Sequence, residues 1–450
     1  ILRAALLTAD VRTREDISKK LGLAYFRQKK YREAGDAYRK AGDLYNAARS
    51  LYRAGTMDEF NKIVSRLVSM EDRRAGQLLL AHAAKKRRDG RAEDALGMFR
   101  DVRKRYPSLT EEALWGIGWT YFRTRDYRNA LAAFTELQNQ YPDSRYLYWK
   151  QRSEEHESDS AKPLPESQGR MKGSKNDIYH FLIQMRESPD LRRGLLQPGQ
   201  LITNPEHASR STFQPPPDVL PSLERFTILI ALSMKEDAVT ELIRISNRVS
   251  RPDVIFYLCR TLQDVGEYKH SISLVSKLSE EMGSKWGNGM NINGILYPLA
   301  FWPTVREISE RYSIDPLVLL SVIREESRFD PSAQSIAGAL GLMQIMPQTA
   351  FALDKKLKMD ISHDSEIYDI RVNITIGGYY LNSLLNEFGS LPEALAAYNA
   401  GHDKVREWLK NGNYASFDEF IEDIPFDETR NYVKRVLMTY ATYLNMTVRE

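Results

Sequence analysis

Acidic and basic side chains crowd together at 324–330, where two adjacent glutamates, Glu325 and Glu326, offer carboxyl groups for acid–base chemistry. No charged residue follows from 331 to 353, a stretch that is rich in glutamine, serine and glycine. A carboxyl group beside such uncharged surroundings loses hydration of its ionised form, so its pKa rises. A raised pKa suits a general acid that works near neutral pH.

The helix expected before this cluster decides which glutamate faces the core. Asp315 is a suitable N-cap and is followed by a proline suited to the first helical position. At about 100° per residue, the apolar residues of this helix form one arc, with Glu326 near its middle and Glu325 at its edge. The arc consists of Val318, Leu319, Val322 and Ile323. Glu326 is therefore the candidate acid; the alternative is an inward-leaning carboxylate that pairs with Arg324 or Arg328.

The uncharged stretch at 331–353 is long enough to cross a membrane. Its glutamines, serines, prolines and glycines argue against a span, because their polar groups would lack partners in hydrocarbon. We interpret it as a buried functional segment.

The charge balance argues against a polyanionic partner. The 450 residues carry 64 lysines and arginines against 60 acidic residues, so no strong field favours nucleic acid. The densest basic run, at 85–88, is followed by acidic residues and is typical of a solvated helix end. We expect no nucleic-acid partner and no transmembrane segment in this chain.

Few residues offer metal or redox chemistry. The single cysteine, Cys259, excludes an intramolecular disulfide and lies in an apolar stretch that is typical of a buried, inert thiol. No other group stands at metal-ligand spacing from His402, which we expect to be exposed. The sequence predicts no metal and no cofactor.

The first part of the chain, 1–153, is helical and repetitive. The segment at 92–107 matches that at 127–142, with alanine, leucine, phenylalanine and Tyr-Pro in equivalent places, and an earlier copy surrounds Tyr25. A period of about 34 residues with small residues opposite aromatics is typical of tetratricopeptide-like (TPR-like) superhelices. Such arrays often bind a protein partner, although the repeat names none.

Composition divides the rest of the chain. Residues 154–221 are polar and proline-rich and indicate a linker or insertion, interrupted by a short helical piece. Helical periodicity over 222–290 indicates a further superhelical or linker region. A Gly/Asn-rich break then separates residues 291–450, which we expect to fold alone as the catalytic domain.

Three motifs in that last part resemble the soluble lytic murein transglycosylase family. They are "ESRFDPSAQSIAGALGLMQIMPQTA" at 326–350, Ala-Tyr-Asn-Ala-Gly at 397–401 and "IPFDETRNYVKRVL" at 424–437. The resemblance implies a mainly α protein, in which a TPR-like superhelix precedes a goose-type-lysozyme-like catalytic domain. The turn after Gly401 departs from the family pattern, which often continues with Gly-Pro.

The resemblance also implies the chemistry. Glu326 would protonate the glycosidic oxygen between N-acetylmuramic acid and N-acetylglucosamine in peptidoglycan, and then accept the proton of the C6 hydroxyl as a 1,6-anhydro ring closes. Glycines at 338 and 341 would let the backbone approach closely. By position, the expected substrate-binding residues are Ser335, Gly341, Met343, Gln344, Met346, Tyr398, Asn399, Glu428 and Tyr432.

Several of these residues have simpler interpretations. Met343 and Met346 could serve packing, Asn399 could anchor a loop, and Glu428 could pair with Arg430. Two competing functions also stay open: a muramidase of the same fold and a non-catalytic glycan-binding scaffold. The family implies a periplasmic or cell-envelope location, with any signal peptide removed or truncated from this chain, which starts at isoleucine.

Overall fold

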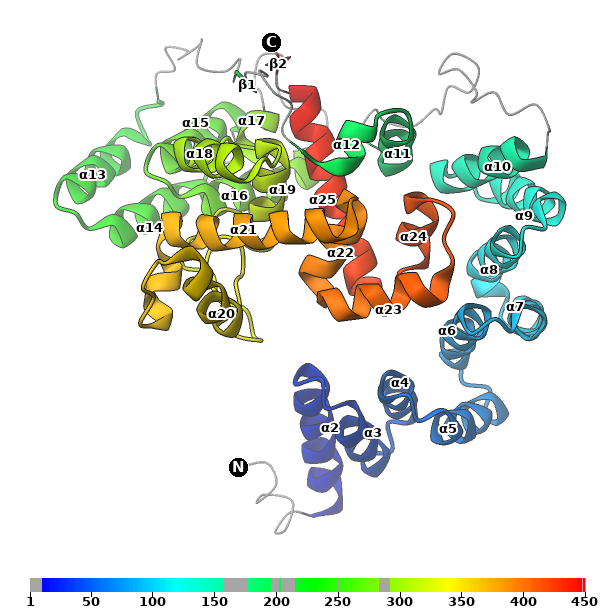
Figure 1. The fold of residues 1–450 in the computed structure, drawn as a ribbon. Coiled ribbons are helices and arrows are strands. Elements are labelled where there is room, and N and C mark those ends of the chain that lie inside the picture. The colour runs from blue at the N-terminus through cyan, green and yellow to red at the C-terminus, as the bar shows by residue number, and fades with distance from the viewer. Residues whose placement is uncertain are drawn as a thin grey trace. The chain divides into compact units, whose positions relative to one another are not determined.

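The computed structural model describes residues 10–157, 177–195, 202–203, 215–249, 251–282, 292–446 and 448–449. The chain is mainly helical and divides into two compact units, Ile1–Gly173 and Ser174–Glu450, which are considered separately (Figure 1). Much of the expected linker at 154–221 lies outside the described residues.

The first unit consists of helical hairpins that follow one another along the chain (Figure 1). Its helices are α2 (Val11–Arg27), α3 (Tyr31–Lys40), α4 (Leu44–Ala54), α5 (Met57–Ser69), α6 (Ala75–Arg88), α7 (Ala92–Arg105), η1 (Pro107–Leu109), α8 (Thr110–Arg123), α9 (Tyr127–Gln140) and α10 (Ser144–Glu157). The two matching sequence segments coincide with α7 and α9, which occupy equivalent places in successive helical hairpins.

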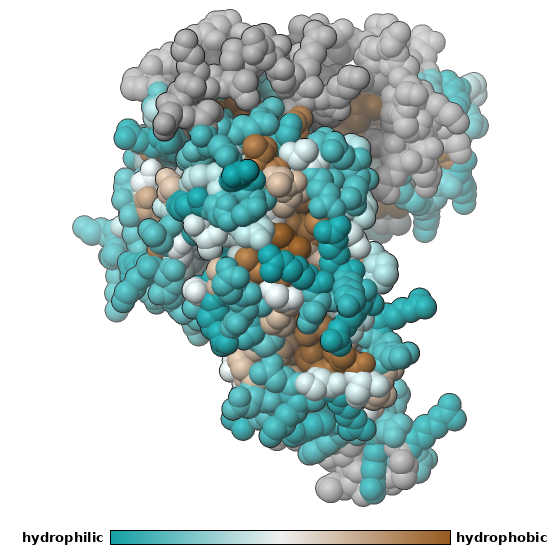
Figure 2. All heavy atoms as spheres, turned by 90° about the vertical axis from the view of Figure 1, so that its right-hand side faces the viewer, coloured by the Kyte–Doolittle hydropathy of each residue, from teal (hydrophilic) through white to brown (hydrophobic). Residues whose placement is uncertain are grey.

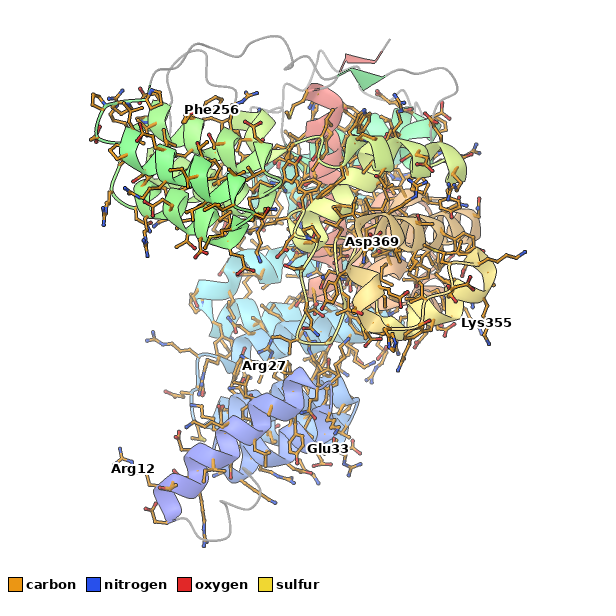
Figure 3. All side chains as sticks on the ribbon, turned by 90° about the vertical axis from the view of Figure 1, so that its left-hand side faces the viewer. Arg12, Arg27, Glu33, Phe256, Lys355 and Asp369 are labelled. Atoms are coloured by element: carbon orange, nitrogen blue, oxygen red, sulfur yellow. The ribbon has the colours of Figure 1, made fainter. Side chains whose placement is uncertain are left out.

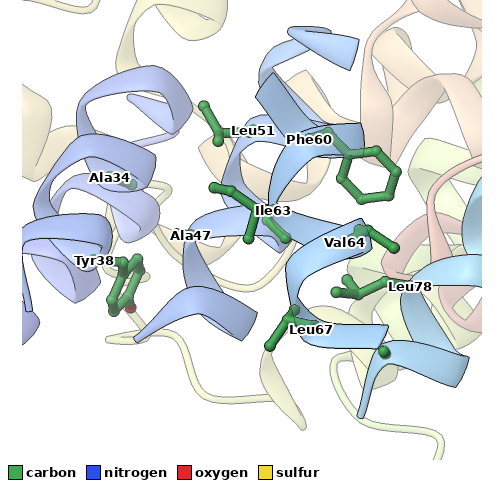
Figure 4. Close-up of a cluster of buried hydrophobic side chains, with 11 residues drawn as sticks. Ala34, Tyr38, Ala47, Leu51, Phe60, Ile63, Val64, Leu67 and Leu78 are labelled. Carbon is green, nitrogen blue, oxygen red and sulfur yellow. The ribbon is translucent and has the colours of Figure 1, made fainter. Parts of the chain in front are cut away.

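Small residues opposite aromatics explain the close helix packing in this unit. A Cβ added to Gly116 would lie 2.3 Å from the Phe99 ring, and one added to Gly118 would lie 2.8 Å from the Phe134 ring. Figure 4 shows a core cluster of the same unit, in which Leu51 and Phe60 of neighbouring helices are fully covered. The hydrophobic residues thus fill the spaces between successive helices.

The surface of the first unit is polar. Arg12, Arg27 and Glu33 lie exposed on the first two helices (Figure 3). Figure 2 shows one side of the molecule, where hydrophobic residues are confined to a narrow band between hydrophilic ones. The basic run at the end of α6 is paired locally, because Lys85 contacts Asp89 at 2.8 Å.

The second unit contains the three family motifs. Its elements are α11 (Ile178–Glu187), α12 (Pro189–Arg193), β1 (Ile202–Thr203), α13 (Leu220–Ala231), α14 (Lys235–Ser246), α15 (Pro252–Asp264), α16 (Tyr268–Met282), α17 (Ile292–Leu296), α18 (Trp302–Tyr312), α19 (Pro316–Ser327), α20 (Pro347–Leu357), η4 (Asp364–Tyr368), α21 (Ile370–Phe388), α22 (Leu391–Ala400), α23 (His402–Gly412), α24 (Phe417–Asp423), α25 (Asp427–Met446) and β2 (Val448–Arg449). The two short strands pair antiparallel.

The short helix α11 is part of the second unit rather than an isolated piece of linker. Its Tyr179 hydroxyl donates to Glu422 of α24 at 2.6 Å, and Lys434 of α25 donates to both of these groups. The Phe181 ring meets the Tyr440 ring edge-on at 5.8 Å. Three elements that are distant in sequence are therefore joined at one point.

The segment after α11 also reaches the start of the candidate catalytic helix. The Asp315 amide donates to the Gly194 carbonyl at 3.1 Å, and Leu195 pairs with Ile314 in an isolated antiparallel bridge. Gly194 has a φ of +64° and packs against Leu391, so a side chain there would be strained and crowded. Residues 177–195 thus help to fix the position of α19.

Two features expected from composition lie where predicted. Cys259 is buried in α15, and burial raises the pKa of its thiol to about 12, so it stays protonated and inert. His402 is exposed at the start of α23. In the part of the chain that the structure describes, no helix is both long and apolar enough to cross a membrane.

Candidate active site

The helix α19 begins as its sequence predicts. The Asp315 side chain accepts a hydrogen bond from the Leu317 amide at 2.9 Å and caps the helix, which starts at Pro316. The same carboxylate accepts from the Tyr440 hydroxyl at 2.7 Å, which ties the cap to α25. Every residue from Pro316 to Ile323 is buried, so the helix is a rigid support for the two glutamates at its end.

The two glutamates have opposite environments. Glu325 accepts from Arg324 at 2.7 Å, from Thr439 at 2.7 Å and from Arg435 at 3.2 Å. Among the described residues Glu326 has no ion-pair partner, so the alternative of a Glu326–Arg324 pair is wrong. Arg328, the other alternative partner, lies within hydrogen-bond distance of the Ser273 hydroxyl at 3.5 Å. The ion pairs belong to Glu325, and Glu326 is left as the isolated acid.

The pKa of Glu326 is raised to about 7, chiefly by burial and to a smaller extent by the charge of Glu325, against the lowering effects of Tyr432 and Arg435. The buried Tyr432 hydroxyl makes no hydrogen bond of full geometry with a described residue, although it lies close enough to Glu326 to affect its pKa. At neutral pH a substantial fraction of Glu326 therefore carries a proton that it can donate.

The chain turns sharply after Glu326. Arg328 and Phe329 both adopt left-handed φ angles, 53° and 63°. The Phe329 ring is fully buried and lies 5.9 Å from the Tyr268 ring of α16, while Lys269 of α16 contacts Asp330 at 2.7 Å. The preceding helical region thus holds the turn, whose strained backbone needs such support.

The uncharged loop after this turn is held by its own backbone. Leu340 and Ile345 exchange two backbone hydrogen bonds, of 2.9 and 3.0 Å. The Ser335 hydroxyl accepts from the Ala339 amide at 2.9 Å, and the Gln344 amide group donates to the Gly341 carbonyl at 2.9 Å. Ser335 and Gln344, both predicted to bind substrate, therefore also stabilise the loop in this structure.

The absence of a side chain at Gly341 allows a close contact with Asn373, which was not expected from the sequence. Its φ is +73°, and a Cβ there would lie 2.3 Å from the side-chain nitrogen of Asn373. Asn373 is fully buried in α21; its amide donates to the carbonyls of Leu340 and Ile367, and its oxygen accepts from the Met343 amide at 2.7 Å. The glycine makes room for an asparagine that fastens the loop, and its predicted contact with the glycan stays a prediction.

Asn373 was not among the residues predicted from sequence. The only signal is a polar residue within the apolar run "RVNITIGGYYL" of a helix. A buried polar group is normally hydrogen-bonded, but the sequence does not say to what.

The two methionines have different surroundings. Met343 is fully buried, and its side chain fills the space above Gly377 of α21. Met346 is 39% exposed at the start of α20. A fully buried side chain cannot contact a substrate in this conformation, so the substrate-binding prediction for Met343 is corrected to packing, whereas Met346 stays available.

The Tyr-Asn pair of the second motif lies at the end of α22. The Tyr398 hydroxyl donates to the Met343 carbonyl at 2.8 Å, and its ring lies 5.4 Å from that of Tyr380. The pKa of Tyr398 is raised by burial and then by the charge of Glu326. Asn399 accepts from the Thr429 hydroxyl at 2.7 Å, as the loop-anchor interpretation predicts. Tyr398 thus lies near the candidate acid.

The third motif forms the first turns of α25. Glu428 is exposed there, and Arg430 contacts Asp427 and the Ile424 carbonyl instead. The alternative of a Glu428–Arg430 pair therefore does not occur among the described residues. Burial and the charge of Glu326 raise the pKa of Tyr432 well above its usual range, so its hydroxyl keeps its proton.

The fold brings four separate segments to one place. Glu326 lies within electrostatic reach of Tyr398 and Tyr432, and the backbone of the uncharged loop meets Tyr398 at Met343. In the described ranges no group of three or more histidine, cysteine or acidic side chains is arranged to hold a metal ion. The arrangement offers one titrating carboxyl, two protonated tyrosines and an uncharged polar loop, which suits acid–base chemistry on a neutral polar substrate.

Replacing Asn373 by alanine should lower the free energy of unfolding by at least about 2 kcal/mol, because the Ile367 carbonyl and the Met343 amide would lose the partner that Asn373 provides, at about 1–3 kcal/mol each. Denaturant titration of the purified protein measures this loss. Asn386→Ala, on the exposed side of the same helix, should change stability by less than about 0.5 kcal/mol. Equal effects of the two variants would contradict the role assigned to Asn373.

Known protein families match both units. Residues 303–421 match the transglycosylase SLT domain, and residues 112–144 match a tetratricopeptide repeat. The soluble lytic murein transglycosylase of Escherichia coli (strain K12) is 39% identical over 152 residues, 33% of this chain and 23% of that protein. A putative soluble lytic murein transglycosylase of Haemophilus influenzae is 34% identical over 130 residues, 28% of this chain and 22% of that protein. The matches thus span less than a quarter of these curated relatives.

Two solved structures share the fold. An inactive mutant of lytic transglycosylase Slt from Pseudomonas aeruginosa aligns with a TM-score of 0.60 and 24% identity, covering 95% of this chain and 67% of that chain. The 70 kDa soluble lytic transglycosylase of Escherichia coli aligns with a TM-score of 0.55 and 18% identity, covering 99% and 83%. Together with the repeat match, they confirm the predicted mainly α class of a TPR-like superhelix followed by a lysozyme-like domain.

Proposed function

Since the second unit contains a transglycosylase SLT domain homologous to that of the soluble lytic murein transglycosylases, we propose that this chain is a peptidoglycan lytic transglycosylase. It cleaves the β-1,4 bond between N-acetylmuramic acid and N-acetylglucosamine and leaves 1,6-anhydromuramyl ends. The observation that carries the proposal is the isolated acid Glu326, whose pKa of about 7 allows it to donate a proton and then to accept one.

The reaction proceeds in two steps on one carboxyl group. Glu326 donates its proton to the glycosidic oxygen, and the bond from that oxygen to C1 breaks, leaving an oxocarbenium-like centre that the substrate's own acetamide stabilises. The Glu326 carboxylate then accepts the proton of the C6 hydroxyl, while the C6 oxygen of the sugar bonds to C1. The 1,6-anhydro ring closes, Glu326 regains its proton, and no water is consumed.

The environment of the neighbouring acids supports a mechanism with one carboxyl. Most glycoside hydrolases use two carboxylates across the scissile bond. The next acids along the chain are both engaged: Asp330 contacts Lys269 at 2.7 Å, and Asp354 accepts from the Ile361 amide at 3.2 Å. Each of the two carboxylates thus has a structural partner, whereas Glu326 has no ion-pair partner among the described residues.

The remaining predicted residues receive the following roles in the proposal. Tyr432 orients the Glu326 carboxyl, because its hydroxyl stays protonated near it, and Tyr398, which donates to the Met343 carbonyl, positions the acetamide. Ser335, Gln344 and Met346 contact the glycan strand from the side of the uncharged loop. Asn399 anchors Tyr398 to α25. Glu428 contacts the glycan strand from the exposed face of α25. Because the substrate belongs to the cell wall, the site of action is the periplasm or cell envelope.

Product analysis tests the proposed function. Purified protein is incubated with isolated cell walls, and the released muropeptides are identified by mass spectrometry. Ends that carry 1,6-anhydromuramic acid support the proposal. Reducing muramic acid ends would establish a muramidase, and binding without any product would establish a glycan-binding scaffold.

The pH dependence follows from the raised pKa of Glu326. The free enzyme must start protonated, so kcat/KM should be level in mild acid and fall about tenfold per pH unit above about 7. Asp330→Asn and Asp354→Asn should leave the shape of this curve unchanged and reduce kcat/KM by less than about tenfold. If kcat/KM of the wild-type protein declines at acid pH and one of these variants lacks that decline, the substituted residue is a second catalytic carboxylate.

A further inference from the structure

One arginine on α25 lies on the same side of the helix as the candidate substrate residues. At about 100° per residue, Glu428, Tyr432 and Arg435 fall within an arc of about 60°. Tyr432 and Arg435 both act electrostatically on the carboxyl of Glu326. The exposed part of this arc therefore runs alongside the catalytic group, and Arg435 extends it by one turn beyond Tyr432.

Glu325 anchors this arginine. Its Oε1 accepts from Arg324 and from Thr439, each at 2.7 Å, and its Oε2 accepts from Nε of Arg435 at 3.2 Å. The Glu325 side chain is only 11% exposed and α19 is rigid beneath it, so the inner edge of the Arg435 guanidinium is held in place.

The outer end of the guanidinium is free. The Arg435 side chain is 55% exposed, and within the described part of the chain its two Nη groups form no hydrogen bond. Two guanidinium groups, those of Arg324 and Arg435, share the single carboxylate of Glu325, so one positive charge is left over. A guanidinium that is fixed through its Nε can donate two parallel hydrogen bonds from its Nη groups to the two oxygens of a carboxylate.

We propose that Arg435 binds a carboxylate carried by the N-acetylmuramic acid residue beside the bond that Glu326 cleaves. The assignment rests on the proposed function. Two groups have this chemistry: the lactyl carboxylate of a strand that has lost its peptides, and a carboxylate of the peptide stem. Neutral sugar contacts come from the uncharged loop, whereas Arg435 supplies selectivity for the charged substituent.

Three glycan substrates separate these sources. The first bears peptide stems, the second is peptide-free with free lactyl carboxylates, and the third is the second after its carboxylates are converted to neutral methylamides. Arg435→Gln should raise KM at least about tenfold on a substrate whose carboxylate it binds, with kcat nearly unchanged and no effect on the neutral strand. Arg435→Lys should restore part of the loss. Measurement near pH 5.5 keeps Glu326 protonated in each variant.

A matched arginine provides the control. Arg406 is 56% exposed, contacts Glu387 through its Nε at 2.6 Å and Asp403 through one Nη at 3.3 Å, and is not among the groups whose charge acts on Glu326. Arg406→Gln should leave KM unchanged on all three substrates. Thermal unfolding of each variant checks that the second unit remains folded.

Equilibrium binding to the Glu326→Gln protein makes the test independent of turnover. Adding Arg435→Gln to that background should weaken binding of charged strands at least about tenfold and leave the neutral strand unaffected. If affinity falls only for the peptide-bearing strand, Arg435 binds a carboxylate of the peptide stem. If affinity also falls for the peptide-free charged strand, Arg435 binds the lactyl carboxylate. Equal losses on charged and neutral strands, or none, would overturn the assignment. Absence of cleavage with all three strands would overturn the proposed function instead, while the binding result still decides the role of Arg435.

Discussion

Replacing Glu326 by glutamine should reduce kcat for cell-wall cleavage by about a thousandfold or more, while glycan binding persists. The amide has nearly the same shape as the carboxylic acid but can neither donate an acidic proton nor take one up. Positioned acid–base catalysis contributes about 10²–10⁴-fold to a rate, and here one group serves both steps. Release of anhydromuropeptides, measured with isolated cell walls, gives the rate.

Glu325→Gln is the sharpest comparison, because it makes the same chemical change one residue away. This variant should keep most of its kcat near pH 6, although the fall of its kcat/KM at alkaline pH should begin at a lower pH than in wild type. The reason is that the charge of Glu325 raises the pKa of Glu326, while Arg435 lowers it and would remain. If both variants lose turnover equally, the distinction between the two glutamates is wrong.

The stability of Glu326→Gln reports independently on the buried acid. Because the pKa of Glu326 is raised from 4.5 to about 7 on folding, the folded state holds this proton more tightly than the unfolded chain. Its contribution to stability is thus present below pH 4.5 and is lost as pH rises toward 7. At about 1.4 kcal/mol per unit, the glutamine variant should gain up to about 3 kcal/mol relative to wild type between pH 4 and pH 8. Denaturant titrations at the two pH values measure this gain.

A fragment that comprises residues 174–450 should fold and cleave cell walls, whereas residues 291–450 alone should unfold or aggregate. The shorter fragment lacks α11, whose Phe181, Leu182 and Met185 are buried. Burying such side chains contributes about 1.5–3 kcal/mol each, so three of them approach the whole stability of a typical domain, about 5–15 kcal/mol. The burial of these three side chains is therefore the reason to expect, against the interpretation from composition, that residues 291–450 are not stable alone.

Circular dichroism, thermal unfolding and a cell-wall assay on both fragments measure this difference. An intermediate fragment, 222–450, lacks α11 together with α12 and β1 but retains α16, which supports the turn after Glu326 through Tyr268 and Lys269. We expect it to melt well below the 174–450 fragment. A stable, active 291–450 fragment would show that α11 and α16 are dispensable.

Local patterns in the sequence determine much of this protein. The N-cap Asp315 and the apolar arc of α19 predict the helix, and its period predicts that Glu326 rather than Glu325 is the catalytic acid, because these properties depend on neighbours within one or two turns. The repeat in the first unit is likewise readable, since glycines and alanines opposite phenylalanines recur at a fixed spacing. The motifs at 326–350, 397–401 and 424–437 indicate the family.

Only the tertiary structure decides which distant groups meet. Asn373 fastens the loop through the Leu340 carbonyl and the Met343 amide, and Arg435 lies against Glu325. Helix α11, which composition assigns to a linker, docks on α25 through Tyr179. Each of these contacts joins side chains far apart in sequence, where local periodicity sets neither the partner nor the distance. The physical reason is that a buried polar group must find a hydrogen-bond partner, but many candidates satisfy that demand until the packing of the helices selects one.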